Sequence, residues 1–238
     1  MVKGALIYEG KAKKIYSIAN NNNLVWVEFK DSLTAFNGEK KAEMAEKGRL
    51  NSLITGLIFN RLSQSGVDTH LKEVVSDKEM ICQKVKIIPL EVVVRNVLAG
   101  STAKKFNIPE GTSLEKPLVE FYYKNDELGD PFISDDQALM LKAADSQEEL
   151  NQLKQKALQV NVLLKDIFAA TGIRLVDFKL EYGKNMQGEI ILADEITPDT
   201  CRLWDMKTGE KLDKDRFRRD LGKVLESYQE VYNRLKNI

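Results

Sequence analysis

Two acidic residues and a lysine alternate with apolar residues in segment 176–182, where Asp177, Lys179 and Glu181 occupy every second position. Successive side chains of a strand point to opposite faces, so these three are expected to share one face. A second apolar segment, residues 189–193, leads directly into Asp194 and Glu195. An acidic residue on each side of a lysine suits phosphate binding beside a magnesium site, although a solvated charged strand would have the same spacing.

The turn between these two segments decides which acidic residues meet. A two-residue turn at Gln187 and Gly188 would place Glu181 directly opposite Asp194, with Cβ atoms about 5 Å apart. Two carboxylates at such a distance repel each other by about 4 kcal/mol, so a cation between them is expected. Magnesium is the predicted ion, because it binds one or two carboxylates together with substrate phosphates and water.

Segment 8–14 (YEGKAKK) combines a glycine with closely spaced lysines. Gly10 would let the backbone approach a phosphate, and Lys11 and Lys13 would supply compact positive charge. The segment matches neither the Walker A pattern nor the dinucleotide-binding glycine pattern. A solvated hairpin tip would have a similar composition, so other segments must support a nucleotide site.

Three further residues suit anion binding. Arg95 shares a strand face with Glu91, and Ser101 opens a short helix, where it is either a phosphate ligand or an ordinary N-cap. Arg202 either clamps a carboxylate or phosphate or forms a surface ion pair. His70 is the only histidine and has no serine or cysteine at a motif spacing, so we expect it to be structural and exclude acyl-enzyme chemistry.

The elements that must position these residues follow from hydrophobic periodicity and turn residues. The predicted strands are residues 5–8, 14–18, 24–29, 80–88 and 90–96, followed by a hairpin at 174–195. The predicted helices are residues 43–64, 147–171 and 213–235.

Pro89 interrupts the strand pattern, so we place a domain boundary there. The fold class is α+β, with a small N-terminal antiparallel-sheet subdomain (1–88) for nucleotide binding. It packs on a larger α+β part (89–238) that is expected to bind substrate and metal.

Composition narrows the function classes. The chain has 238 residues, of which 36 are basic and 36 acidic, so it lacks the basic excess of a nucleic-acid-binding protein. Cys82 and Cys201 have no metal-binding spacing and fit a reduced compartment. No apolar segment approaches about 18 residues, and the N-terminus has no secretory pattern, so a cytoplasmic protein without membrane contact is expected.

These segments together resemble the phosphoribosylaminoimidazole-succinocarboxamide synthase (SAICAR synthetase) family over essentially the whole chain. The similar stretches are residues 8–13, 88–101, 176–183 and 194–199, in the family's order. The resemblance implies the family's fold, which is distantly like kinases and ATP-grasp enzymes. It also implies an ATP-dependent ligase of purine biosynthesis, whose substrates are ATP, L-aspartate and an aminoimidazole carboxylate ribonucleotide.

The resemblance also implies roles for individual residues. ATP would be bound by Gly10, Lys11, Ala12, Lys13, Lys84 and Lys124, and Mg²⁺ with ATP by Glu181 and Asp194. The nucleotide substrate would be bound by Arg95, Ser101, Asp177, Lys179 and Arg202, with further basic contacts from Lys214 and Arg218. Asp177 and Lys179 would be the catalytic pair, beside the substrate carboxylate.

Two other functions remain open at this level. One is a kinase-like phosphotransferase for another small molecule, and the other is a nucleotide-binding regulatory module without turnover. The resemblance implies a homo-oligomer, commonly a dimer. Asn37 departs from the family, since many members have aspartate before Gly38, which puts a substrate or metal role for Asn37 in doubt.

Overall fold

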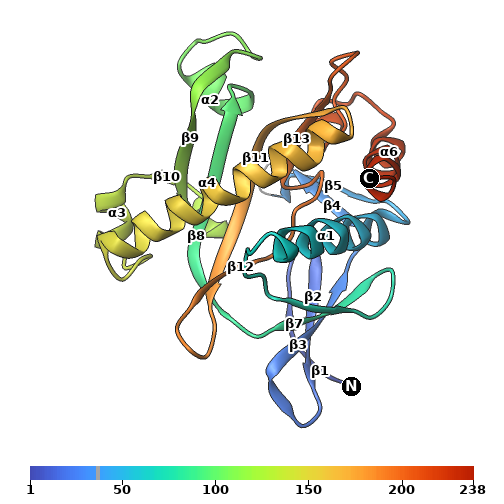
Figure 1. The fold of residues 1–238 in the computed structure, drawn as a ribbon, viewed down its shortest axis with the longest axis vertical. Coiled ribbons are helices and arrows are strands. Elements are labelled where there is room, and N and C mark those ends of the chain that lie inside the picture. The colour runs from blue at the N-terminus through green and yellow to red at the C-terminus, as the bar shows by residue number, and fades with distance from the viewer. Residues whose placement is uncertain (36–37) are drawn as a thin grey trace.

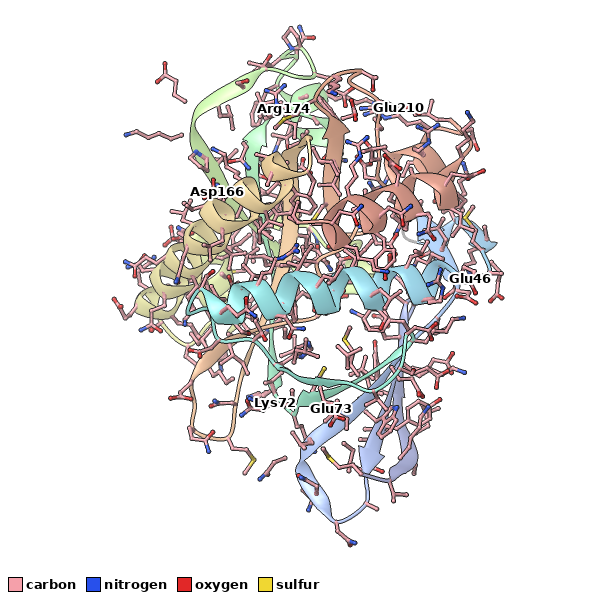
Figure 2. All side chains as sticks on the ribbon, turned by 45° about the vertical axis from the view of Figure 1, so that its right-hand side comes forward. Glu46, Lys72, Glu73, Asp166, Arg174 and Glu210 are labelled. Atoms are coloured by element: carbon pink, nitrogen blue, oxygen red, sulfur yellow. The ribbon has the colours of Figure 1, made fainter. Side chains whose placement is uncertain are left out.

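The computed structural model describes residues 1–35 and 38–238, and in them three antiparallel sheets are packed with helices (Figure 1). Asn37 therefore lies outside the described residues. Charged side chains such as Asp166, Arg174 and Glu210 lie at the periphery of the molecule (Figure 2). No helix of the described residues is long and apolar enough to cross a membrane.

The N-terminal sheet has the strand order β1-β2-β3-β7-β6. Its strands are β1 (Lys3–Glu9), β2 (Lys13–Ile18), β3 (Asn21–Phe29), β6 (Leu71–Val74) and β7 (Glu79–Gln83). Alternating apolar residues of β3 and β7, among them Val27, Phe29, Met80 and Cys82, form its small core. The predicted antiparallel N-terminal sheet is confirmed.

The second sheet carries most of the polar residues singled out above. Its strand order is β10-β9-β8-β11-β12, and β13 also pairs with β11. The strands are β8 (Lys86–Val97), β9 (Ser113–Tyr123), β10 (Phe132–Ile133), β11 (Ile173–Lys184), β12 (Ile190–Ala193) and β13 (Cys201–Asp205). A separate hairpin consists of β4 (Ser32–Ala35) and β5 (Lys40–Glu43).

Helix α4 (Gln147–Ala170) lies across one face of this sheet, in contact with β8, β9 and β11 (Figure 1). Its periodic residues Leu150, Leu153, Ala157, Val160, Leu164 and Phe168 are fully buried there. Helix α1 (Lys47–Gln64) packs against α6 (Val224–Lys236). The remaining helices are short: α2 (Gly100–Lys105), the 3-10 turn η2 (Asp126–Leu128), α3 (Asp135–Met140) and α5 (Asp215–Arg218).

Two local predictions are wrong. Strand β8 runs through Pro89 without interruption, because Pro89 lies where the register against β11 shifts between the pairs Glu181–Glu91 and Gly183–Ile87. At such a bulge a residue without an N–H is tolerated. The chain instead changes sheets between Gln83 and Lys86, and the division into 1–88 and 89–238 stays a prediction.

The single final helix predicted over residues 213–235 is in fact two helices, α5 and α6. Asp220, Gly222 and Lys223 between them have φ angles of 53°, 67° and 50°. Such left-handed backbone cannot continue a right-handed helix. Lys214 and Arg218 lie at the two ends of α5.

Candidate active site

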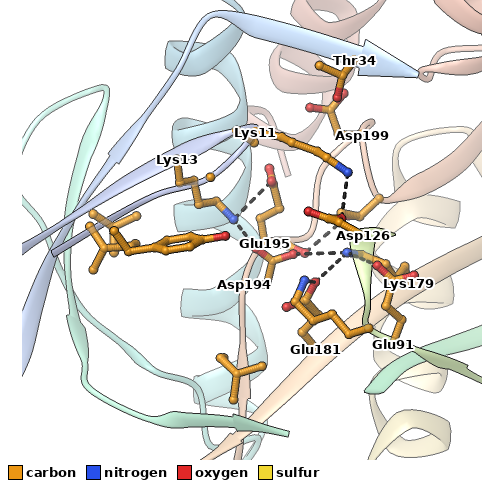
Figure 3. A pocket seen from close by; sticks show the side chains of 18 of the residues that line it. Lys11, Lys13, Thr34, Glu91, Asp126, Lys179, Glu181, Asp194, Glu195 and Asp199 are labelled. Carbon is orange, nitrogen blue, oxygen red and sulfur yellow. Dashed lines mark hydrogen bonds and ion pairs between the residues drawn. The ribbon is translucent and has the colours of Figure 1, made fainter. Parts of the chain in front are cut away.

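A cavity of about 800 Å³ lies between the N-terminal sheet and the polar face of the second sheet (Figure 3). Part of its wall is apolar and comes from Ile7, Ile15, Val25, Val27, Val85 and Ile87. An apolar slot of this kind suits a planar base, and the remaining wall is densely charged. Eleven of the sequence-predicted site residues line it: Gly10, Lys11, Ala12, Lys13, Lys84, Lys124, Lys179, Glu181, Asp194, Lys214 and Arg218.

The β1–β2 connection forms one edge of the cavity. The Gly10 N–H donates to the Lys13 carbonyl at 2.9 Å, which closes the loop tightly. Lys11 reaches across to Asp126 at 2.8 Å, so this loop is tied to the other side of the cavity. The arrangement leaves both the backbone and the lysines of the predicted phosphate loop facing the cavity.

Lys179 stands at the centre of three carboxylates (Figure 3). Its Nζ lies 2.9 Å from Glu91 Oε1, 2.7 Å from Glu181 Oε1 and 3.7 Å from Asp194 Oδ2. Glu181 faces Glu91 across the β8–β11 pairing, and Lys179 precedes Glu181 by two residues on the same face. Burial opposes the charge of Lys179, but the carboxylates outweigh it and raise its pKa well above the ordinary value. We name Lys179, Glu91, Glu181 and Asp194 the central cluster.

Two more lysines neutralise the same carboxylates. Lys124 Nζ lies 2.8 Å from Glu181 Oε1, and Lys13 is paired with Asp194 and, at 3.1 Å, with Glu195 Oε1. Burial raises the pKa of Asp194, but Lys13 and Lys179 more than reverse this and hold it well below its ordinary value. Asp194 is therefore ionised at neutral pH, and Glu181 and Asp194 both have protein cations beside them.

The predicted hairpin register is wrong by one residue. Glu181 pairs with Ala193, because the turn between Asn185 and Glu189 has three residues, the last of which is Gly188 at φ 80°. A type I turn followed by a left-handed residue is a common hairpin form that a glycine alone does not distinguish from the two-residue form. Asp194 leaves the strand at φ 59°, and its carboxylate nevertheless reaches the central cluster.

Four of the predicted substrate-binding residues do not line the cavity: Arg95, Ser101, Asp177 and Arg202. Arg95 Nη1 and Arg202 Nη1 both contact Asp177 Oδ2, at 2.7 Å and 2.8 Å. The register explains this, since Asp177 on β11 pairs with Arg95 on one side and with Arg202 on the other. Glu120 and Asp215 complete the set, so both guanidinium groups are firmly oriented.

Helix α2 begins beside this arginine pair. Its N-cap is Ala99, so Ser101 is not the N-cap; it lies in the first turn with an exposed side chain. Gly100 has φ 61°, and a Cβ there would lie 2.5 Å from Arg202 Nη2. Only a glycine lets the guanidinium approach the backbone this closely.

Lys47 and Asp199 also line the cavity, and the sequence did not predict them as site residues. The side chain of Asp199 is only 7% exposed; it lies 2.5 Å from Lys47 Nζ and accepts hydrogen bonds from Tyr228 Oη at 2.6 Å and Asn51 Nδ2 at 2.8 Å. We name Lys47, Asn51, Asp199 and Tyr228 the distal cluster. The acidic residues in segment 194–199 could have pointed to Asp199. Lys47 and Tyr228 lie within helices, and no sequence pattern marks them as site residues.

The histidine and the two cysteines are side chains that could act as a general base or a nucleophile. His70 lines the cavity, packs edge-on against Phe59 at 5.7 Å, and is neutral because burial lowers its pKa to about 4. Burial raises the pKa of Cys82 to about 12, and Cys201 is also buried.

The donor set can be tested for magnesium. The described residues contain no group of three His, Cys, Asp or Glu residues arranged to hold a metal. Magnesium in nucleotide sites needs only one or two carboxylates, and substrate phosphates and water supply the rest. Glu181 lines the cavity, and both Lys124 and Lys179 donate to its Oε1, so neither lysine occupies Oε2. Glu181 and Asp194 therefore fit such an ion.

Comparisons with known proteins match the same family over nearly the full length of the chain. A family profile described as SAICAR synthetase matches residues 6–235. Phosphoribosylaminoimidazole-succinocarboxamide synthase of Halalkalibacterium halodurans is 56% identical over 236 residues, 99% of each chain. The enzyme of that name from Bacillus subtilis is 55% identical over 238 residues, 100% of this chain and 98% of the relative.

Solved structures agree with the sequence relatives. The crystal structure of phosphoribosylaminoimidazole-succinocarboxamide synthase from Ehrlichia chaffeensis superposes with a TM-score of 0.94 at 46% identity, covering 98% of this chain and 99% of that one. A SAICAR synthetase solved in complex with ADP superposes with a TM-score of 0.92 at 49% identity and covers 97% of each chain.

Proposed function

The chain belongs to the SAICAR synthetase family, and on this premise we propose the part that each site residue takes in the family's reaction. The protein is an ATP-dependent ligase of purine biosynthesis. It joins L-aspartate to the carboxylate of 5-amino-1-(5-phosphoribosyl)imidazole-4-carboxylate and forms the succinocarboxamide, ADP and phosphate. The single observation that carries the assignment of roles is the central cluster, which lies in one cavity with the Gly10–Lys13 loop.

ATP is assigned to the edge of the cavity formed by the N-terminal sheet. The apolar slot would take the adenine, and Gly10, Lys11, Ala12 and Lys13 would surround the phosphates. Lys84 and Lys124 line the same cavity and add positive charge. The ADP bound to a relative of 49% identity supports this choice of ligand.

Glu181 and Asp194 are assigned to Mg²⁺. When bound, this ion would be held by these two carboxylates and would reduce the negative charge of the ATP phosphates. Asp194 is ionised, and Lys179 lies 2.7 Å from Glu181 and 3.7 Å from Asp194, so both carboxylates gather around one point of the cavity, which supports the assignment.

Lys179 and Asp177 are assigned to the reacting carboxylate, and Arg95, Ser101 and Arg202 to the phosphoribosyl part of that substrate. A carboxylate is a poor acyl donor until phosphorylation supplies a leaving group. The aspartate amine can then displace phosphate from the acyl phosphate. Lys179 would position the carboxylate and stabilise the charge that develops during both transfers.

A coupled ADP assay with each substrate omitted in turn tests this function. The ligase requires both L-aspartate and the imidazole carboxylate for ADP release. ADP release without aspartate would indicate a kinase-like phosphotransferase, and ATP binding without any release would indicate a regulatory module.

We also propose a cytoplasmic homodimer. The buried, unpaired Cys82 and Cys201 fit a reducing compartment. The dimer is supported by the family resemblance.

A further inference from the structure

Helix α2 lies at the end of the β8–β9 pair, where the chain passes from one strand to the next (Figure 1). The connection closes on itself, because the Leu98 N–H donates to the Thr112 carbonyl at 2.8 Å and the Gly111 N–H donates to the Leu98 carbonyl at 2.9 Å. The buried residues of this short helix are Thr102 and Ala103. Its apolar packing is therefore small, and polar contacts are needed to set where its first turn lies.

Glu110, in the same connection, supplies such a contact. Its carboxylate accepts two hydrogen bonds from Arg219, from Nη1 to Oε2 at 2.9 Å and from Nη2 to Oε1 at 2.6 Å. The hydrogen bonds from Arg219 lower the pKa of Glu110 to about 2. The charge of Lys211, whose Nζ lies 3.6 Å from Oε1, and the Gly100 N–H act in the same direction. The two residues therefore form a bidentate ion pair at physiological pH.

Arg219 connects this carboxylate to the arginine pair described above. It follows the last residue of α5, and its Nη2 also lies 3.4 Å from Asp215 Oδ2. The same Oδ2 accepts from Arg202 Nε at 3.0 Å. Arg202 lies against the start of α2, since a Cβ at Gly100 would lie 2.5 Å from its Nη2. The contacts thus close a ring, which we name the α2–α5 ring: Gly100, Glu110, Arg219, Asp215 and Arg202.

The α2–α5 ring connects two groups that the proposed function assigns to the nucleotide substrate. Ser101 directly follows Gly100 and has an exposed side chain, and Arg202 lies on β13. A phosphate that contacts both a hydroxyl and a guanidinium needs the two groups at a set separation. This separation depends on how α2 sits relative to β13, and the ring links these elements through α5.

Stability alone explains the Glu110–Arg219 pair poorly. The side chains of Arg219 and Glu110 are 35% and 34% exposed, and ion pairs of such exposure contribute little to folding. A bidentate pair nevertheless fixes the orientation of both of its members.

We propose that Glu110 and Arg219 are a positioning pair for the nucleotide substrate: they hold the first turn of α2 and the Arg202 guanidinium in place, and they act through Ser101 and Arg202. The assignment rests on the proposed function, because that function gives Ser101 and Arg202 their ligand. It adds two residues whose effect should appear in the binding of one substrate only.

The test uses the full-length protein with ADP and Mg²⁺ and titrates ribose 5-phosphate, an unreactive phosphate ester, by calorimetry. In Glu110→Gln and in Arg219→Gln we expect the dissociation constant of ribose 5-phosphate and the KM of the nucleotide substrate to rise about tenfold. The KM of ATP and kcat should stay within about twofold of the wild type. Because the two residues act as a unit, the double variant should be at most about twofold worse than either single variant.

Asp135→Asn is the matched control. It breaks the ion pair of Lys154 with Asp135, whose side chains are 33% and 31% exposed and do not line the cavity. We expect its melting temperature to change as little as that of Glu110→Gln, and the two constants to stay unchanged. If Arg219→Gln does not fold, Arg219→Lys replaces it and should raise both constants less, because lysine keeps the charge without the bidentate contact.

Three results would overturn the proposal: unchanged constants in both single variants, an equal rise in Asp135→Asn, or a double variant whose effect is the product of the two single effects. ADP release by the wild type without L-aspartate would instead refute the proposed function.

Discussion

At the scale of single residues, the central cluster is a lysine that three carboxylates share. Lys179 contacts Glu91 and Glu181 directly and lies 3.7 Å from Asp194. Its raised pKa keeps it cationic over the whole physiological range. A permanent cation at this point suits charge stabilisation, and it cannot serve as a base.

Lys179→Ala is therefore expected to reduce kcat by about 100-fold or more while ADP binding changes only a few-fold. The reason is that a group serving the transferred phosphoryl acts in the transition state. Steady-state kinetics with calorimetric ADP titration measures both quantities. Lys86→Ala, at an exposed position of β8, is the control. A large loss of ADP affinity with kcat retained would make Lys179 a binding residue only.

Glu181→Ala and Asp194→Ala are each expected to abolish ADP formation and to leave the melting temperature close to that of the wild type. Each change removes one of the two carboxylates proposed for Mg²⁺. ADP titrations with and without magnesium should show that the ion tightens binding in the wild type but not in the variants. Near-normal turnover of both variants at millimolar magnesium would disprove the metal assignment.

His70 gives a pH prediction with a clean readout, because it is the only histidine. Its pKa in the folded protein is about 4, against an ordinary value of 6.5, mainly through burial and then through the charge of Lys13. Protonation thus favours the unfolded chain, so the free energy of unfolding should fall as the pH drops from 6.5 towards 4. The single histidine resonance in proton NMR should titrate near 4, and Lys13→Met should move its midpoint upwards.

At the scale of elements, the sequence predicted the strands and helices whose periodicity is strong. The alternation in β11 placed Asp177, Lys179 and Glu181 on one face, and the helical repeat of α4 was located almost to the residue. Both patterns depend on which side chains are buried, and a sequence displays this directly.

The geometry of the hairpin turn was harder to predict from the sequence. Gly188 is compatible with a two-residue or a three-residue turn, and the choice shifts every pair in the hairpin by one. The carboxylates meet all the same, because Asp194 turns out of the strand and three lysines gather around them. Lys13 and Lys124 come from segments distant in sequence from Asp194 and Glu181, and no local sequence pattern predicts such long-range ion pairs.

The start of α2 offers a test at this scale. Gly100→Ala would place a methyl group 2.5 Å from Arg202 Nη2 on a backbone at φ 61°. The displaced arginine should raise the KM of the nucleotide substrate about tenfold or more and leave ADP binding within about twofold. Gly209→Ala is the matched control, with φ 70° but no atom within 4 Å of the new Cβ. An equal effect of both variants would show that backbone strain alone is responsible.

At the scale of the whole molecule, the N-terminal sheet and the second sheet both contribute residues to one charged cavity (Figure 3). Large apolar side chains remain exposed on the described surface, among them Leu6, Phe106 and Val162. For the predicted homodimer we expect light scattering after size-exclusion chromatography to give twice the 27.0 kDa chain mass. A mass of one chain at micromolar concentration would refute the dimer.

Lys11 and Lys13 carry a further consequence. Lys11 pairs with Asp126, and Lys13 pairs with Asp194 and Glu195, so the two lysines tie the first sheet to the rest of the chain. If the phosphates of ATP bind these lysines, nucleotide binding also breaks the ion pairs by which they connect the first sheet to the rest of the chain. The bound nucleotide then replaces these ion pairs as the connection between the two parts, and resistance to proteolysis depends on the nucleotide until ADP leaves.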